Sequence, residues 1–207
     1  MNYLTPKFYW IKCSHKEKKM KKGFALILVA LLVMIAIPIA AEEKPATQLE
    51  QFITKKGEII IKEFYNIGTL SGKFYGTMET TALVIYPPGM SNKLYGLRIH
   101  MKGGGEYPKE NTSFLDFEEI ISLSGALDYM IELSEKWASI EKEYIEVVFQ
   151  TQGDYKIGFY QKGLEQGAFS ESGRIGSASA FLGMKDLETF KSLIDKGLAK
   201  LKSLGAE

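Results

Sequence analysis

The sequence predicts an α+β domain, with a largely antiparallel twisted sheet and two helices on one face of that sheet. Residues 58–101 and 144–182 alternate between apolar and polar side chains, and Gly- or Pro-containing turns divide them into short runs. Residues 116–140 and 184–204 instead repeat apolar side chains at helical spacing. Residues 42–207 contain no cysteine, so the domain depends on a hydrophobic core and not on disulfides.

A long apolar segment separates this domain from a lysine-rich start. Residues 23–41 carry no charged side chain and are long enough for a helix to cross a membrane. Lysines precede this segment and glutamates follow it, which predicts that the rest of the chain is exported. Ala40 and Ala41 favour a signal peptide cut after Ala41, and an uncleaved anchor is the alternative. Met20 is an alternative start, because the chain from there has the usual proportions of a signal peptide.

These features divide the chain into three parts. Residues 1–41 are the signal peptide or anchor, residues 42–56 form a polar spacer, and residues 57–207 form a single domain. Beyond residue 41 the chain carries 24 acidic and 19 basic residues. A mildly acidic domain is a poor electrostatic match for nucleic acid or for an anionic membrane surface. We therefore expect membrane contact only through residues 23–41, if they are not cleaved.

The first half of the domain reads as strands followed by a helix. Turn residues divide the strands, which are predicted near residues 58–66, 74–86, 94–101 and, as a short extended piece, 112–115. Asp116 is a good N-cap, and Glu119 three residues later resembles the second residue of a capping box. The apolar stripe that follows predicts a helix to about residue 140.

The second half repeats this order. Strands are predicted near residues 144–151, 155–161, 164–170 and 174–182, before the helix at 184–204. The two junctions between the last strand and the helix match at an offset of 67 residues, with Phe114 aligned to Phe181 and Ile120 to Leu187. One interpretation is a duplicated four-strand-plus-helix unit, with half-repeats 57–140 and 141–207. The alternative is that any strand leading into an amphipathic helix gives this pattern.

Two successive units of four strands and a helix resemble, in the order of elements, the Whirly-type fold that binds single-stranded nucleic acid. The lysine-rich strand motif by which that family is identified has no counterpart here. We therefore carry over no functional residue and no function.

Sequence motifs for catalysis are missing from the exported part. His100 is its single histidine, and no GxSxG or SxxK element accompanies it. One histidine and no cysteine cannot build the usual zinc shells, so we predict no metal, no cofactor and no catalytic residue. The stretch "KGGGEYP" suggests a phosphate loop, but a flexible connection is the favoured interpretation because no Lys-Ser or Lys-Thr follows.

Three residues are candidates for ligand binding. Arg98 and Arg174 are the two arginines among the exported residues, and both are predicted on strands, where a rigid guanidinium suits a fixed carboxylate. An internal salt bridge is the favoured alternative for each. His100 shares a predicted strand face with Arg98. The last predicted strand, 174–182, is rich in small residues, which indicates either close packing or a shallow groove.

The strands carry many aromatic residues. Neighbouring pairs such as Phe64-Tyr65 and Phe159-Tyr160 point to opposite faces, so some aromatic side chains must lie on the face without helices. We therefore expect an exported, non-catalytic module that binds a protein, a second copy of itself, or an apolar or sugar ligand through that face. A carboxylate-based hydrolase near Arg98 or Arg174 is one alternative, and nucleic-acid binding from the fold outline is the other.

Overall fold

The computed structural model describes residues 47–89, 91–173 and 176–207. The chain divides into two compact units, Met1–Glu43 and Lys44–Glu207, and all described residues belong to the second. The predicted signal peptide or anchor at residues 1–41 therefore lies outside the described residues. Of the helices in the described part of the chain, none is long and apolar enough to cross a membrane.

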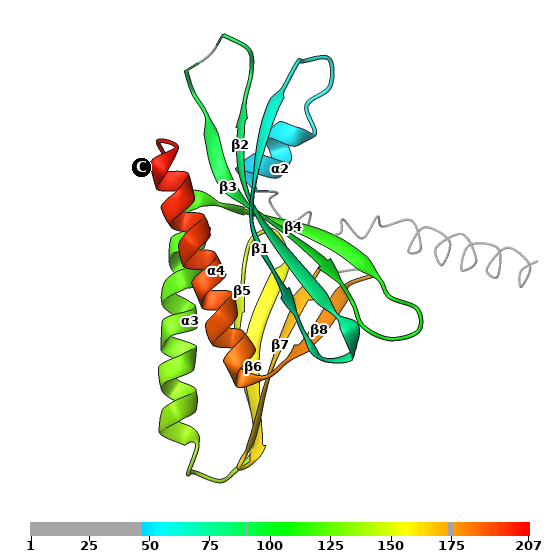
Figure 1. Cartoon of the computed structure of the whole chain (residues 1–207), viewed down its shortest axis with the longest axis vertical. Helices are drawn as coiled ribbons and strands as arrows, with labels where there is room; N and C mark the ends of the chain where they lie inside the picture. The colour runs from blue at the N-terminus through cyan, green and yellow to red at the C-terminus, as the bar shows by residue number, and fades with distance from the viewer. Residues whose placement is uncertain (1–46, 90, 174–175) are drawn as a thin grey trace, which may run out of the picture. The chain divides into compact units, whose positions relative to one another are not determined.

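The first half of the domain is a four-stranded antiparallel sheet, which we call sheet A (Figure 1). Its strands pair in chain order, and each neighbouring pair is antiparallel: β1 (Ile61–Ser71), β2 (Thr77–Tyr86), β3 (Leu94–Lys102) and β4 (Glu110–Asp116). A short 3-10 helix, η1 (Lys73–Tyr75), joins β1 to β2. The helix α3 (Phe117–Trp137) follows β4 directly.

The second half repeats this order and forms sheet B. Its strands also pair in chain order and antiparallel: β5 (Lys142–Gln150), β6 (Tyr155–Gly163), β7 (Glu165–Ser172) and β8 (Ala178–Leu182). The helix α4 (Met184–Ser203) ends this half. The predicted α+β class with antiparallel strands is confirmed.

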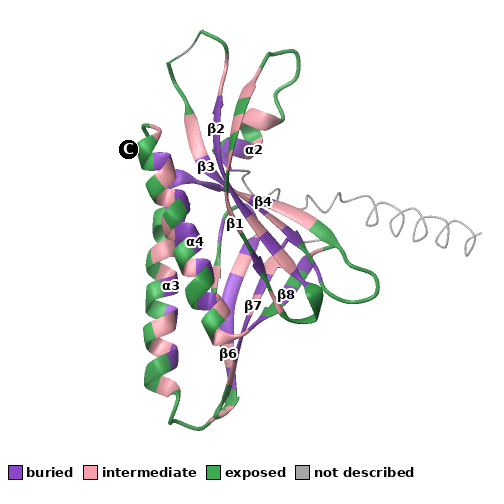
Figure 2. Cartoon of the chain, viewed as in Figure 1, coloured by how far each residue is buried: buried purple, intermediate pink, exposed green. Residues whose placement is uncertain are grey.

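The two helices and the inner faces of both sheets share one hydrophobic core. Helices α3 and α4 pack side by side, and each contacts strands of both sheets (Figure 1). The buried residues of both helices recur every three or four positions and form one stripe directed inward, whereas the outward sides of the helices are exposed (Figure 2). Leu97 of sheet A, Phe159 of sheet B and Phe190 of α4 are all fully buried in this core.

The sequence analysis predicted one sheet, whereas the strands form two sheets. Helix α3 carries the chain away from β4, so β5 begins a new sheet. The edge of β4 is then occupied by the turn between β5 and β6, where a Cβ on Gly153 would lie 2.3 Å from the carbonyl oxygen of Phe114. The sheets also meet through buried hydroxyls, with Ser113 Oγ of β4 at 2.7 Å from Ser172 Oγ of β7.

The two halves use equivalent positions in the same way. Ile120 of α3 and Leu187 of α4, 67 residues apart, are both fully buried. At both helix starts an acid three residues after the N-cap accepts a hydrogen bond from the N-cap N–H. Glu119 accepts from Asp116 at 3.2 Å, and Asp186 accepts from Gly183 at 2.7 Å. This agreement supports the duplicated-unit interpretation.

The predicted spacer contains a helix that the sequence did not indicate. Helix α2 (Gln48–Ile53) begins at the N-cap Thr47, and Leu49 is fully buried against the outer face of sheet A. The Asp116 carboxylate fixes this helix, because it accepts the backbone N–H of Gln48 at 2.7 Å and of Leu49 at 3.1 Å. A six-residue helix is not stable alone, so this anchor holds it to the sheet.

Some strand bounds also differ from the predictions. Strand β1 extends to Ser71, beyond the predicted end at residue 66, because a bulge between Asn66 and Gly68 lets the pairing continue. The strand predicted at 74–86 starts at Thr77, because residues 73–75 form η1. The strand predicted at 174–182 starts at Ala178, and residues 174 and 175 lie outside the described residues.

Replacing Asp116 should loosen α2. We expect Asp116→Ala to lower the free energy of unfolding by about 2–4 kcal/mol, because it removes the N-cap of α3 and leaves N–H groups of α2 unpaired. Asp116→Asn, which keeps one acceptor oxygen, should lose less. Glu135→Ala, at an exposed acid on α3, is the control, and chemical denaturation measures all three. Equal effects of the two alanine variants would contradict this role for Asp116.

Candidate functional site

The predicted binding residues Arg98 and His100 lie at alternate positions of β3, on the outer face of sheet A. Arg98 Nη2 lies 3.1 Å from Oε1 of Glu79 on β2, so the internal salt bridge accounts for this arginine. The Nδ1 of His100 is 3.0 Å from the Thr112 hydroxyl, and its Nε2 is 4.0 Å from Oε2 of Glu110. These side chains are engaged with neighbouring strands, and neither lines any of the three cavities described below.

The third predicted residue, Arg174, lies outside the described residues. The hydrolase alternative placed paired acids near Arg98 or Arg174. Near Arg98, the acid in contact is Glu79 alone among the described residues, and it is bonded to the arginine. This face of sheet A therefore carries paired polar side chains beside an apolar cluster that includes Leu83 and Ile85.

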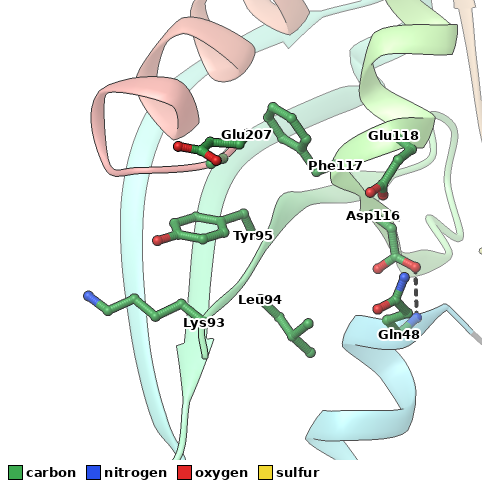
Figure 3. A pocket seen from close by; sticks show the side chains of 9 residues that line it. Gln48, Lys93, Leu94, Tyr95, Asp116, Phe117, Glu118 and Glu207 are labelled. Atoms are coloured by element: carbon green, nitrogen blue, oxygen red, sulfur yellow. Dashed lines mark hydrogen bonds between the residues drawn. The ribbon is translucent and has the colours of Figure 1, made fainter. Parts of the chain in front are cut away.

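A small polar cavity of about 250 Å³ lies between α2, β3 and the C-terminal end of α4. Figure 3 shows Asp116 on one wall, joined to Gln48, with Lys93 and Tyr95 on the other side. The Asp116 carboxylate is already occupied by the N–H groups of α2, and the Tyr95 hydroxyl donates to the Leu204 carbonyl at 3.2 Å. This cavity is best explained as the junction that fixes α2 and the chain end.

The outer face of sheet B is different, because it is aromatic. One row of paired residues across the sheet consists of Val148, Gly158, Phe169 and Phe181. A cavity of about 430 Å³ lies on this face, and its aromatic lining is Tyr144, Tyr160, Phe169 and Phe181. Tyr144 is 58% exposed and Phe181 is 53% exposed, so these rings face solvent.

Two glycines let the other rings lie close to the sheet. A Cβ on Gly167 would come within 2.5 Å of the Tyr160 side chain, and a Cβ on Gly158 would lie 3.2 Å from the Phe169 ring. Each ring therefore covers a glycine of the neighbouring strand, in the manner of an aromatic side chain that shields a strand glycine. The rings of Tyr160 and Phe169 therefore lie close against the outer face of sheet B.

A second cavity, of about 420 Å³, continues this face toward η1. It shares Ser179 and Phe181 with the cavity of about 430 Å³, and its other aromatic residues are Phe74 and Tyr107. We call the two cavities together the aromatic groove, lined by Phe74, Tyr107, Tyr144, Tyr160, Phe169 and Phe181. The ring of Phe74 stands at 90° to that of Phe181, with the centroids 6.4 Å apart.

The wall at Phe74 is held in an uncommon backbone conformation. Phe74 has φ 58° and Tyr75 has φ 66°, in the left-handed region that residues other than glycine rarely adopt. The stretch Gly103-Gly104-Gly105 makes room for them, because a Cβ on Gly104 would lie 2.3 Å from the Phe74 carbonyl oxygen. Gly103 N–H donates to Lys109 and Gly105 N–H donates to Phe74, so these two amides do not form an anion site.

Polar side chains stand at both ends of the aromatic groove. The Tyr144 hydroxyl donates a hydrogen bond to Glu146. This hydrogen bond and, to a smaller extent, burial raise the pKa of Tyr144 above its usual value. Glu171 forms an ion pair with Lys156 at 3.6 Å. At the other end Lys73, Lys109 and two serine hydroxyls line the second cavity. The groove is thus aromatic in the middle, with hydrogen-bonding groups at its rim.

Comparison with known proteins gives no family assignment: the chain matches no protein-family model, no curated protein and no solved structure. Within the described residues, no group of three or more His, Cys, Asp or Glu side chains is placed to hold a metal ion. The candidate site therefore rests on the aromatic groove alone.

The sequence indicated this site only in part. The prediction that some aromatic side chains lie away from the helices is consistent with Phe64, Tyr144 and Phe181, all of which are exposed. The two interpretations of the last strand both apply: Ala178 and Ala180 are buried, whereas Ser179 and Phe181 line the groove. The sequence analysis missed the pairing of a glycine with an aromatic residue on the neighbouring strand. Such a pairing can be recognised only when the strand register is known.

Gly104 should be necessary for the wall of the aromatic groove. We expect Gly104→Ala to lower the free energy of unfolding by about 1–3 kcal/mol, because the added methyl group overlaps the Phe74 carbonyl. Gly125→Ala is the control: Gly125 lies in α3 with nothing near its Cβ position, and alanine there should stabilise by about 0.5–1 kcal/mol. Thermal unfolding measures both variants, and a shift in the same direction would contradict the packing role.

Proposed function

We propose that this protein is an exported, non-catalytic module that binds a carbohydrate in the aromatic groove. The observation that carries the proposal is the run of six aromatic residues along two adjoining cavities, with carboxylates, hydroxyls and lysines at the rim. The export part rests on the apolar residues 23–41 and the lysines before them. Fractionation that finds the native chain dissolved in the cytosol would contradict it.

The chemistry of the aromatic groove fits a sugar. The face of an aromatic ring is electron-rich, and the C–H bonds on one side of a pyranose ring carry partial positive charge, so the two surfaces attract each other. Sugar hydroxyls can donate to Glu146 and Glu171, and hydrogen bonds to charged acceptors are the stronger class. Ligand sites commonly combine an apolar lining with a few such polar groups.

Other occupants fit the aromatic groove less well. An extended peptide cannot add a strand at β8, because a Cβ on Gly72 beside η1 would lie 2.7 Å from the Phe181 carbonyl oxygen and so η1 occupies that edge. A second copy would place one concave face against another. Single-stranded nucleic acid, suggested by the fold outline, would bring phosphates near Glu146 and Glu171.

Polysaccharide binding tests this proposal. The purified full chain is titrated against a panel of neutral and acidic polysaccharides by affinity electrophoresis and calorimetry. Phe181→Ala and Tyr144→Ala should each weaken binding about two- to twelvefold, because a lost ring contact is worth roughly 0.5–1.5 kcal/mol. Tyr129→Ala removes a ring of matched exposure, 61%, from the surface of α3 and should leave binding unchanged. Equal effects at all three positions, or no binding to any polysaccharide, would contradict the proposal.

A carboxylate-based hydrolase is the second candidate, because Glu146 and Glu171 line one cavity. Glycoside hydrolysis requires two carboxyl groups that flank the bond to be broken. If the groove is catalytic, incubation with a bound polysaccharide should release reducing ends, and Glu146→Gln and Glu171→Gln should each abolish that release while binding persists. Binding without release of reducing ends supports the non-catalytic module.

A further inference from the structure

Three of the four sheet edges in the described part of the chain are covered or interrupted. The edge of β4 faces the turn at Gly153, and the edge of β8 faces η1. Strand β1 is interrupted by its bulge at Asn66 and Gly68, and a Cβ on Gly68 would lie 2.8 Å from the Leu193 side chain of α4. Covering and bulges are the usual ways in which proteins prevent edge strands from pairing with other chains.

Among the described residues, the edge of β5 is interrupted only by a bulge near its start. β5 pairs with β6 on one side and ends the sheet on the other. Its bulge lies between Lys142 and Ile145, so the rest of the strand, to Gln150, is regular. Val148 is 44% exposed, and the core-facing Val147 and Phe149 are only partly buried, because no strand lies beyond them.

We propose that β5 pairs antiparallel with β5 of a second copy of this chain, about a two-fold axis at Val147. This axis places Val147 opposite itself and Ile145 opposite Phe149 of the partner subunit. These residues belong to the inner face, where each subunit's β5 already packs on its core. The contact would therefore continue each hydrophobic core across the axis.

The charges on β5 select this register over its neighbours. An axis at Glu146 would place two carboxylates directly opposite each other, which is unfavourable. An axis at Val148 would shorten the pairing to residues 146–150, because the strand ends at Gln150. With the axis at Val147, residues 144–150 pair within the strand, and Glu146 stands opposite Val148 of the partner subunit.

This arrangement joins the two aromatic faces. Sheet B of each copy would continue into that of the other, and Tyr144, at the β5 end of the groove, would lie near the axis. The pairing needs only the backbone edge and the β5 side chains, so it does not depend on what the groove binds.

A charge exchange at position 148 tests the interface and its register. Val148→Glu places a carboxylate opposite Glu146 of the partner subunit, and Val148→Lys places an ammonium there. We expect the dissociation constant of the dimer to be about fivefold or more higher for Val148→Glu than for Val148→Lys, because two symmetric pairs change sign. Both replace the same exposed valine with a long charged side chain, so each controls for the other's effect on the subunit.

Native mass spectrometry of the full chain at several concentrations gives the dissociation constants, and a cysteine at position 147 gives an independent result. In a Cys13→Ser background, Val147→Cys should form a disulfide-linked dimer on mild oxidation, because residues on the axis face each other within disulfide range. Asn66→Cys, on the edge of β1, is the control and should form no disulfide-linked dimer.

The outcomes decide the proposal. A dimer that weakens with Val148→Glu, tolerates Val148→Lys and cross-links at 147 supports it. A monomer at every concentration, equal behaviour of the two charged variants, or cross-linking at 66 and 147 alike would overturn it. The polysaccharide results enter none of these readouts, so this proposal and the proposed function can fail separately.

Discussion

The shared core is the constraint on which the rest of this structure depends. Each four-stranded sheet has an apolar inner face. No strand of either sheet covers that face. Helices α3 and α4 lie side by side and contact both sheets, so a single core serves both halves. Because both helices are used on the inner side, the outer faces of the sheets must be satisfied in some other way.

The two halves satisfy their outer faces differently, and this difference produces the site. On sheet A, Leu49 of α2 lies against Gly96, where a Cβ would be 2.3 Å from the leucine, and polar pairs such as Arg98 with Glu79 cover the remainder. Sheet B has no counterpart of α2, because only residues 138–141 lie between α3 and β5. Its outer face is covered by its own rings, Tyr160 over Gly167 and Phe169 over Gly158.

Close backbone approach forms the wall of the aromatic groove at Phe74. The glycines at 72 and 76 allow η1 to lie against β8, and this contact both covers a sheet edge and places the Phe74 ring beside Phe181. The cost is two aromatic residues in left-handed conformations, each worth about 1–3 kcal/mol of strain. Such strain persists only where the surrounding packing holds it, as the contacts at Gly104 do here.

Local chemistry in the sequence was sufficient to predict most of the elements but not their assembly. Helices α3 and α4 follow from a 3.6-residue apolar period, and Asp116 from its capping chemistry, because these depend on residues within one turn. The division into two sheets, the helix at 48–53 and the partners of Arg98 depend on residues far apart in the chain, such as the 68 positions between Gln48 and Asp116. The aromatic groove is of the second kind: the sequence determined that aromatic side chains exceed what one face can bury, and only the strand register decided that six of them line one surface.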